Sequence, residues 1–165
     1  MEQKILVCGF GNKLKKDDGL GPYIIEKLSE RKLPDYVSLR DFGTSGFRAA
    51  LEIGNYDTVI VVDAINAGHK PGTLYRLVIS HADAINSTTL TSFFVSLHES
   101  DLQRTLATAA LIGQYPKRVI ILGIEPLDIS FGLTQSDIIA DAMDGLIDII
   151  FDEIKGVVGV GEKGF

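Results

Sequence analysis

Three short and almost wholly apolar segments limit what this chain can fold into. They are KILVCGF at 4–10, TVIVVDA at 58–64 and RVIILGI at 118–124. Apolar runs of this length, rich in β-branched residues, are typical of strands that are buried on both faces of a sheet. Each of the three segments is therefore predicted to be a strand in the interior of a sheet.

Amphipathic segments lie between these strands. Helices are expected at 19–32, 45–53, about 101–112 and 134–155. Two further strands are expected at 36–42 and 73–79, and the alternating side chains of the second place it at a sheet edge. Because strands alternate with helices, the chain is predicted to be an α/β protein with a largely parallel sheet.

The length of 165 residues indicates one domain. That domain is assigned to residues 1–155. Residues 156–165, with four glycines, are expected to form a flexible tail. Residues 83–91 have the composition of a loop, and for 92–97 a short strand and a loop both remain open.

Charge and cysteine content exclude several classes of protein. The net charge of −6 and the lack of a basic run argue against binding to nucleic acid. The single cysteine, Cys8, excludes a disulfide within the chain and a cysteine-based zinc site. Because Cys8 lies within a predicted strand, it is expected to be a small buried apolar residue rather than a reactive thiolate.

The sequence shows no feature that would direct the chain out of the cytoplasm. The first residues lead directly into a strand and lack the regions of a secretory signal peptide. No apolar stretch reaches the roughly 18 residues that a membrane-spanning helix requires, so no membrane span is expected. A cytoplasmic location is the resulting expectation.

Three polar segments follow or end apolar stretches, at 12–21, 63–72 and 96–100. They carry Asp18, Asp63 and His98. In alternating strand–helix chains, the ends of parallel strands meet at one edge of the sheet, where binding sites form. Two carboxylates and one imidazole brought together there would form a metal site with oxygen and nitrogen ligands.

Each of these residues also has a purely structural interpretation. Either Asp17 or Asp18 could cap the following helix, and the adjacent pair suggests that one caps while the other points outward. Asp63 could accept hydrogen bonds from nearby backbone N–H groups, and a lone histidine such as His98 is often a surface or core residue. Gly21, three residues after Asp18, has no side chain and would allow another backbone segment to lie close to it.

Other catalytic and binding motifs receive little or no support. The glycine pair at 9–12 lacks the third glycine of the dinucleotide-binding fingerprint, because Leu14 stands in its place. The chain contains neither the His-Glu-x-x-His motif of zinc proteases nor the Gly-x-Ser-x-Gly motif of serine hydrolases. Ser45 has no evident partner base, and nothing singles out His69 or His81.

Several of these motifs, taken in order, resemble the hydrogenase maturation endopeptidases, which process the large subunit of nickel–iron hydrogenases. The opening segments are ILVCGFGN at 5–12 and DDGLGP at 17–22. The others are DFGT at 41–44, VVDA at 61–64, KPGT at 70–73, SLHE at 96–99, GIEP at 123–126 and GLT at 132–134. The resemblance extends over about residues 4–155.

This resemblance implies a single-domain three-layer α/β/α fold with a twisted sheet of about five strands. It implies that Asp18, Asp63 and His98 contact a metal, with catalytic roles secondary to metal binding. The implied activity is removal of the C-terminal extension of a nickel-loaded hydrogenase large-subunit precursor. Nickel would come with the precursor, and the protein would be a monomer or weak oligomer that binds its partner transiently.

Two other functions remain open on the residues alone. The same three residues would serve a non-enzymatic nickel-binding or adaptor protein for hydrogenase assembly, which would leave the mass of the precursor unchanged. A flavodoxin-like domain that binds a small molecule is supported by fold analogy alone. Neither a general base nor a nucleophile is identified by the residues themselves.

Overall fold

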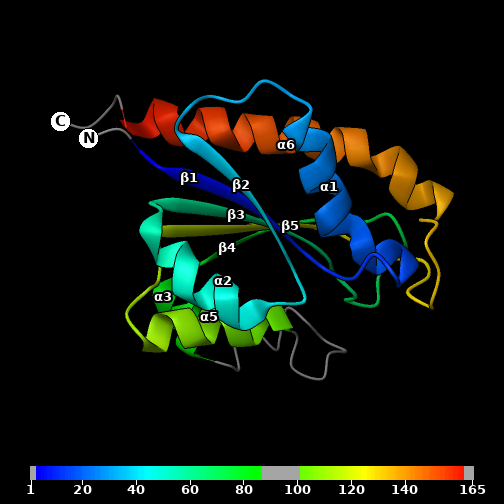
Figure 1. The fold of residues 1–165 in the computed structure, drawn as a ribbon, viewed down its shortest axis with the longest axis horizontal. Coiled ribbons are helices and arrows are strands. Elements are labelled where there is room, and N and C mark those ends of the chain that lie inside the picture. The colour runs from blue at the N-terminus through cyan, green and yellow to red at the C-terminus, as the bar shows by residue number, and fades with distance from the viewer. Residues whose placement is uncertain (1–2, 87–100, 162–165) are drawn as a thin grey trace.

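The computed structural model of the protein describes residues 3–86 and 101–161 (Figure 1). Its five strands are β1 (Ile5–Phe10), β2 (Val37–Gly43), β3 (Thr58–Ala64), β4 (Leu74–Ile79) and β5 (Arg118–Ile124). Its α-helices are α1 (Leu20–Ser29), α2 (Gly46–Glu52), α3 (His81–Ile85), α5 (Asp101–Leu111) and α6 (Asp137–Gly161). Two short 3₁₀ helices are η1 (Lys16–Gly19) and η2 (Ile53–Asn55).

The strands form one sheet in the order β2-β1-β3-β5-β4. β1 pairs in parallel with β2 and β3, and β3 pairs in parallel with β5. Only β4, at the edge, runs antiparallel to its neighbour β5. The predicted α/β class, the largely parallel sheet of five strands and the edge position of residues 73–79 are therefore confirmed.

Helices cover both faces of the sheet, which gives the three expected layers. In Figure 1, α1 and α6 lie on one side of the sheet, and α2, α3 and α5 lie on the other. Alternate residues of β1 enter the two cores: Ile5 and Val7 pack toward α1 and α6, whereas Leu6 and Cys8 pack toward α2 and α5. This two-sided burial explains why the strand sequences are apolar throughout.

Cys8 lies in the core, as predicted. None of its surface is exposed, and burial raises the pKa of its thiol far above the usual range. A thiolate at this position is excluded at physiological pH, because only an exposed electropositive setting would stabilise one.

The segment at 83–91 was expected to be a loop, and this was wrong for the part that the structure describes. Residues 81–85 form α3, which begins with a capping box. The Ser80 Oγ accepts a hydrogen bond from the Asp83 N–H (3.1 Å), and the Asp83 carboxylate accepts one from the Ser80 N–H (2.9 Å). An aspartate at this position, rather than the usual Glu or Gln, made the start of this helix hard to recognise.

Helix α6 continues to Gly161, into the segment 156–165 for which a flexible tail was expected. The side chains of Ile154 and Val157 are only 2% and 3% exposed, and both pack in the core beneath α6. Contact with the core therefore compensates for the low helix propensity of Gly156 and Gly159.

Within the described residues, no helix combines the length and the apolar character that crossing a membrane requires.

Candidate functional site

A pocket of about 360 Å³ opens at the carboxyl ends of the parallel strands. Its wall is built from the segments that follow β1, β2, β3 and β5, together with the first turn of α5. The lining residues are Phe10, Gly11, Lys15, Asp18, Gly43, Thr44, Asp63, Ala64, Asn66, Asp101, Leu102, Pro126 and Ile129. The chain leaves β1 toward β2 on one side and later returns to β3 on the other, so the pocket lies where the strand order reverses. This is the position where open α/β sheets bind ligands.

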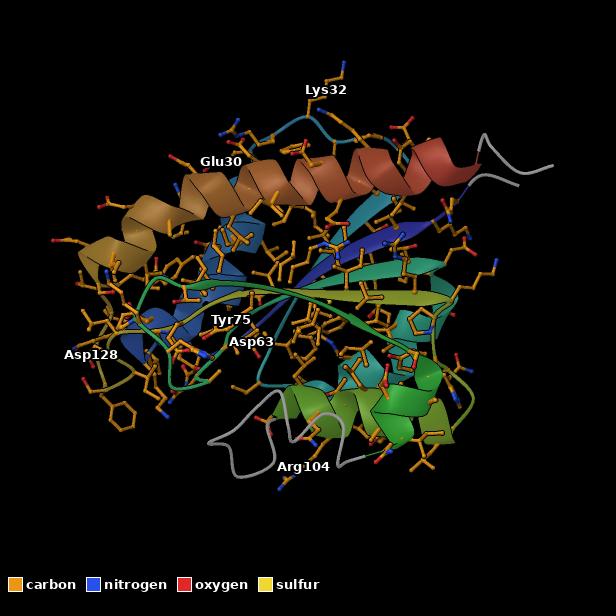
Figure 2. All side chains as sticks on the ribbon, turned by 180° about the vertical axis from the view of Figure 1, so that it is seen from behind. Glu30, Lys32, Asp63, Tyr75, Arg104 and Asp128 are labelled. Carbon is orange, nitrogen blue, oxygen red and sulfur yellow. The ribbon has the colours of Figure 1, made fainter. Side chains whose placement is uncertain are left out.

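Asp18 and Asp63 both line this pocket, although 45 residues of sequence separate them. Asp63 lies at the end of β3, and Asp18 lies in η1, just after β1. These two acids therefore lie in one pocket at the expected edge of the sheet, and their role in binding a metal stays a prediction. Figure 2 shows Asp63 beside the sheet at the end where the loops after the strands gather.

Asp63 occupies a position where its negative charge is unfavourable. Removal from water and the nearby carboxylate of Asp18 raise the pKa of Asp63 well above its usual range. A hydrogen bond from the Ala64 backbone opposes this shift, and the charge of Asp101 adds to it. A bound cation would relieve the repulsion between these acids.

Close packing between β1 and the following helix fixes the position of Asp18. A side chain at Gly21 would come within 2.3 Å of the Phe10 carbonyl oxygen, so only glycine lets α1 lie this close to the strand. Gly11 has a φ of +134°, and a Cβ there would lie 1.8 Å from the Asp18 carbonyl oxygen. The Asp18 carboxylate accepts a hydrogen bond from the Asn12 N–H at 3.0 Å, which orients it in the pocket wall.

Asp17 does not cap the helix; instead it holds the loop between β5 and α6. It is fully buried and accepts hydrogen bonds from the N–H groups of Leu127 and Asp128, both at 2.9 Å. The backbone N–H and the hydroxyl of Ser136 donate two more, at 2.7 and 2.8 Å. Neither Asp17 nor Asp18 makes a side-chain cap at η1 or α1, so that structural interpretation was wrong.

Glu125 has a comparable structural role that was not expected from the sequence. It follows β5, is 3% exposed, and accepts hydrogen bonds from the N–H groups of Ala67 (2.9 Å) and Gly68 (3.1 Å). The Tyr75 hydroxyl also donates to it, and His69 Nδ1 lies 2.9 Å from that hydroxyl. Glu125 thus holds the segment that follows Asp63, and its place directly after a buried strand was the available signal.

Asp101 is a third acid in the pocket wall, at the start of α5. From the sequence, no role in the site was expected for Asp101. Helix α2 packs closely against the same end of α5. The approach is so close at Gly46 that an added Cβ would lie 2.4 Å from Thr105 Oγ1. Lys15 is the basic residue among those that line the pocket.

His98 lies outside the described residues, as do residues 92–97, so its place in the site stays a prediction. Within residues 3–86 and 101–161, no group of three or more His, Cys, Asp or Glu side chains is arranged to hold a metal ion. The two acids that do share the pocket supply only part of the predicted ligand set.

Comparison with known proteins gives a consistent result. A model of the hydrogenase maturation protease family matches residues 22–153. The hydrogenase expression/formation protein HoxM of Azotobacter vinelandii is 32% identical over a match of 164 residues, and the match covers 97% of this chain and 77% of HoxM. The hydrogenase 2 maturation protease of Escherichia coli is 34% identical over a match of 137 residues, and the match covers 81% of this chain and 80% of that protein.

Among solved structures, the hydrogenase maturating endopeptidase HybD from E. coli has a similar fold. The TM-score is 0.79 at 27% sequence identity, and the match covers 93% of each chain. The likeness therefore extends over nearly the whole fold.

Proposed function

The chain belongs to the hydrogenase maturation protease family and is thus a peptidase, and from that premise we propose that it removes the C-terminal extension of a nickel-loaded hydrogenase large-subunit precursor. The observation that carries this proposal is the meeting of Asp18 and Asp63, from two separate segments, in one pocket at the switch point of the sheet.

Nickel would arrive as part of the substrate rather than as a resident cofactor of the protease. Asp18 and Asp63 would offer carboxylate oxygens, and His98 would offer an imidazole nitrogen, all of which suit a divalent transition metal. The pKa of Asp63 is raised first by its removal from water and then by the nearby charge of Asp18, and a bound cation would offset the second of these effects. Precursor that carries nickel would therefore bind better than precursor that lacks it.

Nickel bound between the precursor and these residues could assist hydrolysis in two ways. A divalent ion polarises a carbonyl group that it contacts, and it lowers the pKa of a water that it binds. Either effect would activate the scissile peptide bond or its attacking water. We assign Asp18, Asp63 and His98 to metal contact first and to catalysis second.

The proposal also includes partner and location. The partner is one large-subunit precursor in a transient complex, with the protease a monomer or weak oligomer in the cytoplasm. Measuring the mass of the complex by light scattering checks the stoichiometry.

Substitution of the three residues tests the function. Purified nickel-loaded precursor is incubated with wild-type protein or with Asp18→Ala, Asp63→Ala or His98→Ala, and its mass is measured. Asp148→Ala, an exposed acid on α6, serves as the control. We expect the wild type and the control to shorten the precursor, and the three site variants to do so at least about a hundredfold more slowly.

Two results would contradict the proposal. Full cleavage by all three site variants would show that these residues are not required. An unchanged precursor mass with the wild type, despite a stable complex, would instead favour the non-enzymatic adaptor.

A further inference from the structure

A group of exposed apolar side chains borders the candidate pocket; we call it the apolar rim. Four of its members lie on the loop between β5 and α6, and one lies beside that loop. The rim comprises Leu127 (61% exposed), Ile129 (39%), Phe131 (83%), Leu133 (68%) and Leu14 (58%). Single exposed apolar residues are ordinary, but a gathered group is typical of an interaction site.

The rim is continuous with the pocket. Ile129 belongs to the rim and also lines the pocket that holds Asp18 and Asp63. Leu14 is brought to the loop by a hydrogen bond from the Gly132 N–H to the Leu14 carbonyl, at 2.9 Å. In Figure 2, Asp128 of this loop lies at the same end of the molecule as Asp63 and farther out. A chain that entered the pocket along this side would therefore meet the rim at Ile129.

Hydrogen bonds hold the loop that carries the rim in a defined conformation. At one end, Asp17 binds the N–H groups of Leu127 and Asp128. At the other end, the Lys16 N–H donates to the Gly132 carbonyl at 3.0 Å, and the Tyr23 hydroxyl donates to the Leu133 carbonyl at 3.0 Å. Because the loop is already ordered, little conformational entropy would be lost when a partner binds to it.

The charge of Asp128 on this loop is neutralised by a lysine of η1. The Lys16 ammonium lies 2.6 Å from the Asp128 carboxylate, and Asp128 accepts hydrogen bonds from the backbone and hydroxyl of Ser130. These contacts lower the pKa of Asp128 far below its usual range, so it stays ionised and paired. The surface offered to a partner is consequently dominated by the apolar side chains.

The pocket is small compared with the protein substrate of the proposed function. A volume of about 360 Å³ lies near the lower end of the range for sites that hold one small ligand, so it can enclose only a short segment of such a substrate. Most of the affinity for such a substrate has to come from contacts outside the pocket, where buried apolar side chains contribute most.

We propose that the apolar rim is the docking surface for the hydrogenase large-subunit precursor, which would cover it with an apolar patch beside the segment that enters the pocket. This inference rests on the proposed function, since it names the surface by which the same site receives its substrate.

Matched serine substitutions test the docking surface. Phe131→Ser and Leu133→Ser each remove a rim side chain that contributes little to the folded core. The control is Leu111→Ser, because Leu111 is 74% exposed but is the last residue of α5, about 15 Å along the helix from Asp101 in the pocket wall. Thermal unfolding of all three variants should match the wild type.

Two measurements follow for each variant. The first gives KM and kcat for cleavage of nickel-loaded precursor, and the second gives the Kd for nickel-free precursor by titration. We expect both rim variants to raise KM and Kd roughly ten- to hundredfold, as expected for loss of one buried Phe or Leu from an interface. We expect kcat to stay within about twofold and the control variant to match the wild type.

The outcomes separate this inference from the function on which it rests. If the wild type cleaves the precursor and the rim variants keep its KM and Kd, the docking surface is wrong and the proposed function stands. If the wild type does not cleave, the Kd values still decide whether the rim binds the precursor. If the rim variants abolish self-association of the protease and leave the Kd for precursor unchanged, the rim joins two copies of this chain, and the inference is overturned.

Discussion

At the scale of single residues, Asp63 shows how a residue of the candidate site can oppose stability. Its carboxyl group is removed from water and lies near Asp18, and both effects disfavour the ionised form. In the unfolded chain the group ionises near its ordinary value of 3.8, whereas in the folded protein it ionises only at higher pH. The folded state therefore binds this proton more tightly than the unfolded state does.

Asp63→Asn should consequently stabilise the protein at neutral pH. The substitution removes the free-energy cost of ionising Asp63 in the folded protein. This cost is absent below pH 3.8, grows as the pH rises to the pKa that Asp63 has in the folded protein, and is constant above that pKa. For a protein of this size, each kcal/mol recovered raises Tm by roughly 2–4 °C. Thermal unfolding of the variant and wild type at several pH values checks this. A difference in Tm that is absent at neutral pH, or that does not shrink toward pH 4, would contradict it.

Glu125 shows the opposite case, a buried acid whose carboxylate is surrounded by hydrogen-bond donors. Its carboxylate accepts three hydrogen bonds, one of them from the Tyr75 hydroxyl. Burial of Tyr75 and its hydrogen bond to Glu125 raise the pKa of Tyr75 to about 12, so the tyrosine remains a donor throughout the neutral range. In Glu125→Gln an amide NH₂ would face one of the backbone donors. We expect a loss of about 1–3 kcal/mol in the free energy of unfolding, measured by urea denaturation.

The same variant tests whether Glu125 positions the segment after Asp63. Because Ala67 and Gly68 are held by this carboxylate, Glu125→Gln should also lower kcat for precursor cleavage. Asp148→Asn, a conservative change at an exposed acid, is the control. Unchanged stability and kcat in Glu125→Gln would show that the hydrogen bonds do not fix this segment.

At the scale of elements, the interior strands could be predicted because burial on both faces leaves a direct mark on their sequence. Residues 58–64 and 118–124 are strands with the predicted bounds. The ends of helices depend on contacts that a local pattern does not contain. Helix α6 reaches Gly161 because Val157 packs against core residues that are distant from it in the sequence. Asp17 binds a loop more than a hundred residues away along the chain and does not cap the helix that follows it.

The junction of β1 and η1 depends on glycine for two separable reasons. Gly11 and Gly113 both have positive φ, at +134° and +74°, but only a Cβ at Gly11 meets another atom, the Asp18 carbonyl oxygen. Gly113→Ala should cost about 1 kcal/mol from backbone strain alone. Gly11→Ala should cost more, at least about 3 kcal/mol, and should displace Asp18. Urea denaturation measures both, and equal losses would show that the clash is relieved elsewhere.

At the scale of the whole molecule, topology explains why the candidate site could be predicted in part. Asp18 follows β1 and Asp63 lies near the end of β3, and these two strands are parallel neighbours, so the order of the sheet brings the two acids to one edge. The place of Asp101 in the pocket wall and the hydrogen-bond partners of Glu125 depend on how loops from different strands pack, so a local sequence pattern does not give them. The sequence pattern indicates the edge of the sheet at which residues gather, but not which of them touch.

The central claim is that this pocket recognises the hydrogenase precursor through its nickel. The most direct test is the mass of the precursor, prepared with and without nickel, after incubation with the wild-type protein under identical conditions. We predict that only the nickel-loaded precursor loses its C-terminal extension, and that the nickel-free form keeps its full mass. Equal shortening of both forms would contradict the claim, because the acids of the pocket would then act without a metal to recognise.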